Sequence, residues 1–261
     1  MYSRKEQLQV YWKLQRAIVP RLRYSQYLYE DILAREAMSG ITWLDLGCGH
    51  RLLPEWRAKE EKVLLGDKTI VGIDCDFPSL TRHPNLSLKV CGNIGRLPFR
   101  DSSFDLVTAN MVVEHLDDPS RQFREIGRIL KPGGRFIFHT VNRYGHFALM
   151  RRLTPHRIKN RVVRVLDGRE PEDVFEVHYK ANTRRRIEEL SRAAGFHVVK
   201  IRMLVTDAVF EIIPPLAAVE LLWIRALMTR PLRSLRTNIA AILQKPDAKM
   251  ERLRMHPDPA P

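Results

Sequence analysis

A turn with two glycines follows a short apolar run and gives the first sign of a binding site. The run reads Leu44-Asp45-Leu46-Gly47-Cys48-Gly49. Glycines allow the backbone to turn sharply and to approach a ligand closely at the carboxyl end of a parallel strand. Asp45 lies inside the run, where a carboxylate is costly unless it meets a cation or hydrogen-bond donors. A tight turn alone would account for the glycines, whereas the acid favours a ligand with a positive group.

A second acidic residue ends the next apolar run. Asp74 closes Val71-Gly72-Ile73-Asp74, 25 residues after Gly49. Nucleotide-binding folds place an acid at this point to accept hydrogen bonds from ribose hydroxyls. Asp76 is the second candidate for that role. The alternative is that Asp74 caps the following helix, and the nearby glycine turn favours the ribose interpretation over it.

The segments that carry these residues alternate between strands and helices. Short runs rich in β-branched and aromatic residues predict strands at 41–46, 69–74, 86–92, 104–110 and 134–142. The runs are continuous rather than alternating, which indicates strands buried on both faces of a parallel sheet with crossover helices.

Helices and later strands complete the predicted order. Two N-terminal helices are separated by Pro20, and Gly40 is expected to end the second. A helix over 119–130 begins at Pro119 and is expected to stop at Lys131-Pro132-Gly133-Gly134. The remaining elements are a helix at 183–194, a strand at 196–205, an apolar helix at 214–228 and a last strand at 236–246.

Four segments, in this order and spacing, resemble the class I S-adenosylmethionine-dependent methyltransferases, most closely the ubiquinone and menaquinone group. They are LDLGCG (44–49), VGIDCD (71–76), CGNIGRLPFRDSSFDLVTANMVVEHL (91–116) and LKPGGRFIFHTVN (130–142). The similarity covers about residues 40–142, with weaker echoes at 178–205 and 238–246. It implies an α/β fold with a doubly wound, mostly parallel seven-stranded sheet. It also implies S-adenosyl-L-methionine as cofactor, with S-adenosyl-L-homocysteine as product.

The resemblance also implies which residues hold the cofactor. The first loop would bind its methionine part, Asp74 both ribose hydroxyls, and the Asn93 position the adenine amino group. The full set of predicted contacts is Asp45, Gly47, Cys48, Gly49, Asp74, Cys75, Asn93, Ile94 and Asn110. Two positions depart from the family pattern. Asn93 stands where an Asp is usual, and Arg51 stands where a third glycine is common. A form of the fold that binds the cofactor without catalysis is therefore one alternative.

Methyl transfer from a sulfonium needs positioning and desolvation, and a general base only if the acceptor must lose a proton. His115 is the leading candidate because the resemblance places Glu-His-Leu over the cofactor. His178 and Tyr179 could reach the acceptor from the insertion after the fifth strand. The alternatives are that His115 packs against the adenine or caps a helix, and that His178 and Tyr179 pack within a lid. No carboxylate cluster implies a catalytic metal.

The chain is basic, with 44 Lys and Arg against 30 Asp and Glu. The resulting charge of +14 favours anionic partners. We expect a small or lipid-linked acceptor, methylated at oxygen in preference to carbon. An RNA-modifying or nucleic-acid-binding protein on the same fold is the alternative, although the sequence contains no RNA-binding motif.

Three segments are expected to shape the acceptor site around a methyltransferase domain at 41–246. They are an N-terminal helical lid at 1–40 and two roof insertions at about 143–180 and 207–235, while 247–261 is expected to be a flexible tail. The first insertion is rich in arginine. An apolar helix flanked by basic residues suits contact with a membrane surface. The helix at 214–228 has four such residues, Arg225, Arg230, Arg233 and Arg236. A core helix or a dimer contact is the alternative, and the chain is expected to be a monomer or a homodimer.

The cysteines and the distribution of apolar segments indicate the cellular compartment of the protein. Cys48, Cys75 and Cys91 have no metal-type spacing and lie in or just after apolar runs, so buried, reduced thiols are expected. No segment has the features of a secretory signal or of a confident membrane span. These observations predict a cytoplasmic protein that attaches at most to the inner face of a membrane.

Overall fold

The computed structural model describes residues 3–38, 40–53, 57–153 and 176–248. Several features expected from the sequence lie outside these ranges. They are the arginine-rich part of the first insertion, including Arg157, Lys159, Arg161 and Arg164, and most of the expected tail, 249–261.

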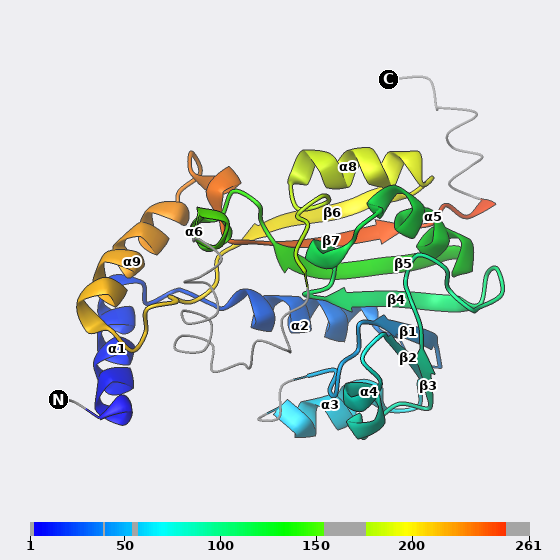
Figure 1. Ribbon diagram of the computed structural model, residues 1–261, viewed down its shortest axis with the longest axis horizontal. Helices are drawn as coiled ribbons and strands as arrows, with labels where there is room; N and C mark the ends of the chain where they lie inside the picture. Colours follow the sequence, from blue (N-terminus) through cyan, green and yellow to red (C-terminus); the bar gives the residue numbers. More distant parts are fainter. Residues whose placement is uncertain (1–2, 39, 54–56, 154–175, 249–261) are drawn as a thin grey trace, which may run out of the picture. The chain divides into compact units, whose positions relative to one another are not determined.

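A seven-stranded sheet forms the centre of the described chain, in the order β3-β2-β1-β4-β5-β7-β6 (Figure 1). The strands are β1 (Thr42–Leu46), β2 (Thr69–Asp74), β3 (Leu88–Cys91), β4 (Phe104–Asn110), β5 (Leu130–Val141), β6 (His197–Leu204) and β7 (Asn238–Gln244). Strand β1 pairs in parallel with both β2 and β4, β2 with β3, and β4 with β5.

Strand β7 runs against β5. The Gly133 N–H donates to the Lys245 carbonyl at 2.9 Å, and the Asn142 N–H donates to the Thr237 carbonyl at 2.7 Å. The residue numbers rise along one strand and fall along the other, which defines an antiparallel pair. The predicted fold class, a mostly parallel seven-stranded α/β sheet, is confirmed.

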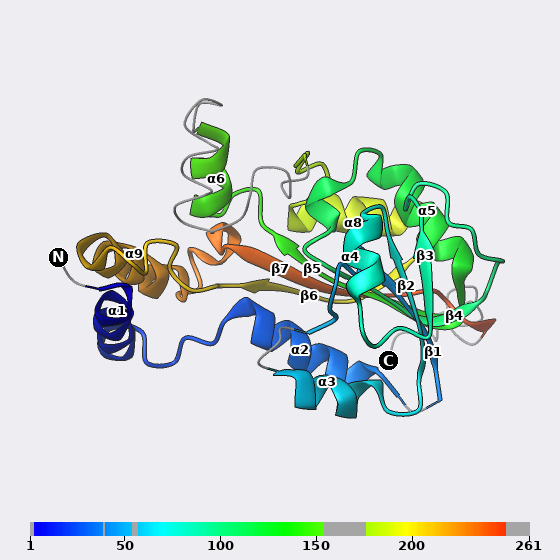
Figure 2. The same cartoon turned by 60° about the horizontal axis from the view of Figure 1, so that its bottom comes forward.

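Helices cover both faces of the sheet. The described helices are α1 (Arg4–Ile18), α2 (Ser25–Glu36), α3 (Ala58–Leu65), α4 (Phe77–Arg82), α5 (Pro119–Ile129), α6 (His146–Leu153), α8 (Arg184–Ala193) and α9 (Pro214–Leu227). Figure 2 shows α5 and α8 on one face and α2 and α3 on the other. Because β5 side chains alternate between the faces, Phe136 lies 5.7 Å from Phe123 of α5, ring centre to ring centre, whereas His139 stacks on Tyr29 of α2.

The chain divides into two compact units. One contains 29–140, 178–202 and 240–261, and therefore most of the sheet and the predicted cofactor residues. The other contains 1–28, 141–177 and 203–239, which include helices α1, α6 and α9. The core of this second unit is formed by buried apolar side chains of α1 and α9 and their flanking segments, with Tyr11, Leu221, Ile224 and Leu227 fully buried.

Local sequence accounts for the boundaries of the best-defined helix. The side chain of Asp118 accepts the Arg121 N–H at 3.1 Å and caps α5, and Pro119 occupies the first turn. The apolar residues Phe123, Ile126 and Ile129 are buried on one face. The helix thus begins where predicted and ends one residue early.

Three local predictions are wrong. The strand predicted at 134–142 already begins at Leu130, because Gly133 and Gly134 pair with Lys245. Helix α2 ends at Glu36, and Gly40, at φ +68°, turns the chain toward β1 instead of capping the helix. All three cysteines are free, but only Cys48 is buried, while Cys75 and Cys91 are exposed at strand ends.

Candidate functional site

The glycine turn after β1 is held by backbone contacts to β2. The Gly47 N–H donates to the Ile73 carbonyl at 2.8 Å, and Gly47 has φ +61°. A Cβ at this position would lie 2.4 Å from Cγ2 of Val112. Gly49 also has a left-handed φ, +53°, yet none of the residues that the structure describes lies within 4 Å of where its Cβ would be. The turn therefore needs glycine at Gly47 for space and conformation, and it leaves an open surface at Gly49.

Asp74 joins this turn to the end of β2. Its carboxylate accepts the Gly49 N–H at 2.8 Å through Oδ2 and the Asp76 N–H at 2.9 Å through Oδ1. The helix-capping role considered for Asp74 is carried by Asp76, which accepts the Ser79 N–H at 3.2 Å and begins α4. Each Asp74 oxygen keeps a second lone pair for a further donor, such as a ribose hydroxyl.

Asp45 is a buried carboxyl group beneath the turn. It accepts the Thr108 hydroxyl at 2.5 Å, and that hydroxyl in turn accepts the Trp43 indole N–H at 2.7 Å. Burial raises the pKa of Asp45 to about 7, and the hydrogen bond from Thr108 opposes this shift. The negative charges of Asp74 and Glu61 raise the pKa further. The negative charges of these neighbouring carboxylates create a negative potential at the turn. A cationic ligand would be attracted there and would reduce their mutual repulsion.

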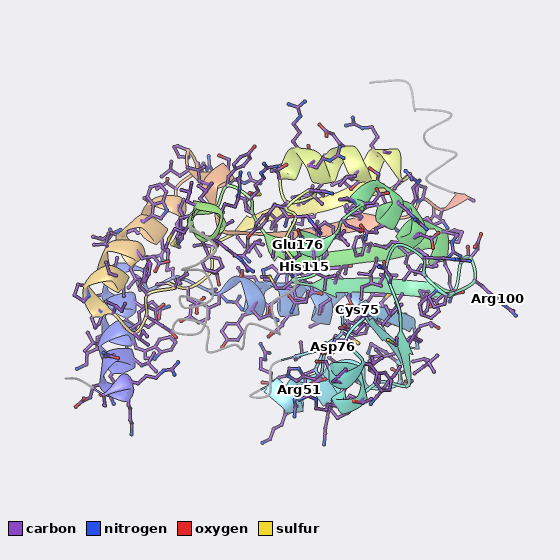
Figure 3. All side chains as sticks on the ribbon, in the orientation of Figure 1. Arg51, Cys75, Asp76, Arg100, His115 and Glu176 are labelled. Carbon is purple, nitrogen blue, oxygen red and sulfur yellow. The ribbon has the colours of Figure 1, made fainter. Side chains whose placement is uncertain are left out.

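The residues predicted near an adenine ring lie after β2 and β3. Cys75 and Asn93 are exposed and Ile94 is half-buried, and Figure 3 shows Cys75 and Asp76 just beyond the end of β2. The side-chain oxygen of Asn93 accepts the Gly95 N–H at 2.6 Å and closes a local turn. That oxygen therefore already has one structural role in this chain.

The end of β4 is shaped by a strained residue and a buried histidine. Met111 follows β4 with φ +57°, a left-handed conformation that a side chain other than glycine rarely adopts. Asn110 contacts Nδ1 of His139 at 3.0 Å through its side-chain oxygen. Burial lowers the pKa of His139 to about 4, so this imidazole is neutral near pH 7. His139 is therefore a core residue.

The three predicted catalytic residues converge on one short segment. His115 lies beyond the end of β4, where it is labelled in Figure 3, and is half-buried. The backbone N–H groups of His178 and Tyr179 donate to the carbonyl of Glu114, at 2.9 and 3.2 Å. Tyr179 has φ +53° and is buried. The fold thus joins residues 63 or more positions apart in sequence, as the 2.7 Å hydrogen bond from Lys180 Nζ to the Asp117 carbonyl also shows.

A buried polar network supports this junction. Thr140 Oγ1 donates to Glu114 Oε2 at 2.7 Å, and Asn182 Nδ2 donates to Thr140 Oγ1 at 2.7 Å. All three side chains are buried. The network fixes the two segments that carry His115 and His178. Sequence reasoning missed Thr140 and Asn182. Thr140 lies within the segment 130–142, but the sequence assigns it no role there, because its pairing with Asn182 exists only in the folded chain.

Comparison with known proteins shows what part of the chain is similar to. Residues 44–138 match the family described as a methyltransferase domain. The ubiquinone biosynthesis O-methyltransferase of Coxiella burnetii is 31% identical over 101 residues, which are 38% of this chain and 43% of that protein. The chain therefore aligns with less than half the length of this curated relative.

Solved structures share the fold at low sequence identity. An S-adenosylmethionine-dependent methyltransferase from Mesorhizobium loti matches with a TM-score of 0.54 and 17% identity, over 84% of this chain and 97% of that one. Geranyl diphosphate C-methyltransferase from Streptomyces coelicolor, solved with S-adenosyl-L-homocysteine, matches with a TM-score of 0.51 and 16% identity, over 84% and 75%.

The family match and the sheet order point the same way. Residues 44–138 match a methyltransferase domain family, and the seven-stranded sheet has the class I, Rossmann-like fold seen in solved S-adenosylmethionine-dependent methyltransferases. The residues fit that cofactor. Gly49 leaves space beside the turn, Asp74 has free lone pairs at the end of β2, and the carboxylates around Asp45 suit a cationic group.

The two glycines of the turn should differ in tolerance. We expect Gly49→Ala to lower the free energy of unfolding by about 1 kcal/mol, the cost of a left-handed alanine. Gly47→Ala should cost at least about 3 kcal/mol, because the clash with Val112 adds to that strain. Urea unfolding of both variants measures the difference, and equal midpoints would contradict the packing described for Gly47.

Asp45 should make stability fall as pH rises. The folded protein keeps this group protonated up to about pH 7, whereas the unfolded chain ionises it above about pH 4. The folded state therefore binds more protons across this window, so its free energy of unfolding falls by up to about 1.4 kcal/mol per pH unit. Asp45→Asn keeps the shape and the hydrogen-bond acceptor without titrating. Denaturant titrations of both proteins at pH 4 to 7 test the effect, and parallel pH profiles would contradict it.

Proposed function

We propose that this protein transfers the methyl group of S-adenosyl-L-methionine to a small acceptor with an apolar portion and a negative charge, at oxygen in preference to carbon. The observation that carries the proposal is the joined pair of Gly49 and Asp74 beside the negative environment of Asp45. When bound, the cofactor supplies an already activated methyl group for in-line displacement. The task of the protein is then to bind, orient and exclude water.

Each residue of the first site has a distinct part in this proposal. The turn at Gly47–Gly49 allows close approach of the methionine moiety, and Asp74 accepts hydrogen bonds from the ribose hydroxyls. Asn93 and Ile94 line the adenine position with Cys75, while Cys48 and Asn110 complete the wall. Asp45 stabilises the positive charge of the bound cofactor from beneath the turn, and its own ionisation is favoured in return.

Acceptor recognition is assigned to the N-terminal segment and to the two insertions. In the proposal, residues 1–40 act as a lid, and the insertions at about 143–180 and 207–235 form a roof. Among the residues of these segments that the structure describes, exposed apolar and arginine side chains support an acceptor that is both apolar and anionic. The names of two similar proteins, ubiquinone biosynthesis O-methyltransferase and geranyl diphosphate C-methyltransferase, support the same class of acceptor. Such acceptors partition into bilayers, so the proposal includes a peripheral position at a membrane.

His115 is proposed as the group that removes a proton from an acceptor hydroxyl. It is joined through Glu114 to the segment of His178 and Tyr179, which would position the acceptor on its other side. The buried Glu114–Thr140–Asn182 network holds both segments in place before the acceptor binds. Preorganisation of this kind lowers the cost of orienting the reacting groups.

Cofactor binding can be tested without knowing the acceptor. Calorimetric titration with S-adenosyl-L-homocysteine should give micromolar binding, and Asp74→Asn should weaken it at least about tenfold, by exchanging a charged acceptor for a neutral one. Asp76→Asn is the matched control, because an asparagine can keep the cap of α4. No binding to folded wild-type protein would refute the proposal, and equal losses in both variants would refute the role of Asp74.

Kinetic measurements can distinguish a general-base role of His115 from a role in packing against the cofactor. With an acidic amphiphile that proves to be an acceptor, His115→Gln should lower kcat about 100-fold or more and leave the affinity for S-adenosyl-L-homocysteine unchanged. Single-turnover assays with titration calorimetry measure both quantities. A variant that loses cofactor affinity but keeps kcat would show that His115 packs against the cofactor instead.

A further inference from the structure

Helix α9 carries apolar side chains on its exposed face as well as on its buried face. Ala217, Leu221, Ile224 and Leu227 are fully buried and pack in the core formed with α1. These positions recur at three- and four-residue spacing, as expected of the inner face of a helix. A helix in a soluble environment would carry polar side chains on the opposite face.

The opposite face of α9 carries large apolar side chains instead. Leu216, Val219, Leu222 and Trp223 are exposed by 46%, 67%, 57% and 39% of their surface. At 100° per residue they fall within one stripe about 120° wide. Several large apolar side chains gathered on one stripe mark an interaction surface, whereas scattered single ones do not.

The exposed charges of α9 and of the segment that follows it are of one sign. From Ile212 to Arg236 the chain contains four arginines and one acidic residue, Glu220. Glu220 is buried, where it accepts the Val209 and Phe210 N–H groups and contacts Nε2 of His146 at 2.8 Å. No carboxylate of this stretch therefore reaches the exposed surface. Arg225, Arg230 and Arg233 are exposed at the C-terminal end of the stripe.

The fourth arginine does not belong to this surface. The guanidinium of Arg236 donates to the carbonyls of Leu227, Met228 and Met203, at 2.9, 3.0 and 3.1 Å. It therefore satisfies the last carbonyls of α9 and is half-buried. The expectation that all four arginines flank the helix for lipid contact is wrong for Arg236.

From this arrangement we propose that the exposed stripe of α9 docks on an anionic lipid bilayer, with Arg225, Arg230 and Arg233 at the headgroups. Positive side chains complement anionic lipids, whereas the same stretch of a second copy offers no exposed carboxylate to pair with these arginines. The 14 residues of α9 extend about 21 Å, too short to cross a hydrocarbon core of about 30 Å. No described helix is long and apolar enough to span a membrane, so α9 would lie flat at the interface. The biological purpose of this docking rests on the proposed function, because a lipid-linked acceptor would lie in the bilayer that α9 contacts.

Flotation with vesicles tests the docking. The full chain should float with phosphatidylcholine vesicles that contain phosphatidylglycerol, and much less with phosphatidylcholine alone or at high salt. Val219→Glu with Leu222→Glu should lower partitioning roughly tenfold or more, because two carboxylates would enter the apolar interface. Arg225→Glu should lower it by about fivefold or more, the contribution of one basic residue near an anionic surface.

Matched controls separate docking from misfolding and from catalysis. Val63→Glu makes the same change at an 81% exposed position of α3 and should leave flotation unchanged. Titration with S-adenosyl-L-homocysteine should be equal in the wild type and the α9 variants, because the cofactor residues belong to the other compact unit.

Each outcome has a separate meaning. A chain that binds S-adenosyl-L-homocysteine but floats with no vesicle overturns the docking and leaves the methyltransferase proposal standing. A chain that floats but binds no S-adenosyl-L-homocysteine overturns the methyltransferase proposal and leaves the docking standing. A dimer in light scattering that Val219→Glu dissociates, without flotation of the wild type, would assign the stripe to a second copy and overturn the bilayer.

Discussion

The carboxylate of Asp74 accepts hydrogen bonds from the backbone N–H groups of Gly49 and Asp76. These two hydrogen bonds connect the loops that follow β1 and β2. A parallel sheet brings the carboxyl ends of its strands to one edge, but it does not fix the loops that leave them. An ionised carboxylate that accepts two backbone N–H groups does so strongly, because charge-assisted hydrogen bonds are about twice as strong as neutral ones. The glycine turn therefore keeps one shape, with its open side beside Gly49 available to a ligand.

Buried carboxyl groups recur in the two units, and each is satisfied differently. Burial and the nearby carboxylates raise the pKa of Asp45 to about 7, and its carboxyl group accepts one hydrogen bond from Thr108. Glu114 accepts the Thr140 hydroxyl inside a polar network, and Glu220 accepts two backbone N–H groups. A buried carboxylate without such partners would cost several kcal/mol, on the order of the whole stability of a domain. These groups thus bind distant segments of chain to one another while they remain inside.

The two faces of α9 show how one helix can serve the fold and a surface at once. Its inner face forms a core with α1 that the N-terminal segment could not form alone, and its outer face is left apolar beside three exposed arginines. Arg236 holds the end of the helix from within. Arg236 therefore has a structural role, because its guanidinium reaches backbone carbonyls at the end of α9. The three exposed arginines belong to the surface with the outer apolar side chains.

Residue order alone determined the fold class, the strands, the glycine turn and the acid that follows β2, because these features are encoded locally. Continuous apolar runs, left-handed glycines and capping residues act over a few positions, so Asp118 with Pro119 predicts the start of α5 without reference to the rest of the chain. The roles of Asp74 and Asp76 could not be separated in this way, since both precede the same helix and only the folded backbone shows which one caps it.

Tertiary structure decided the features that depend on contacts between distant positions. The strand continues through residues 131–134 because Lys245 pairs with Gly133 and Gly134, and Cys75 and Cys91 are exposed because each lies where its strand leaves the sheet. The junction of Glu114 with His178 and Tyr179, and the partners Thr140 and Asn182, follow from chain crossings that no local pattern records. Side-chain hydrogen bonding and burial depend on the whole packed chain, whereas periodicity depends on neighbours, and that difference separates what the sequence predicted from what the fold added.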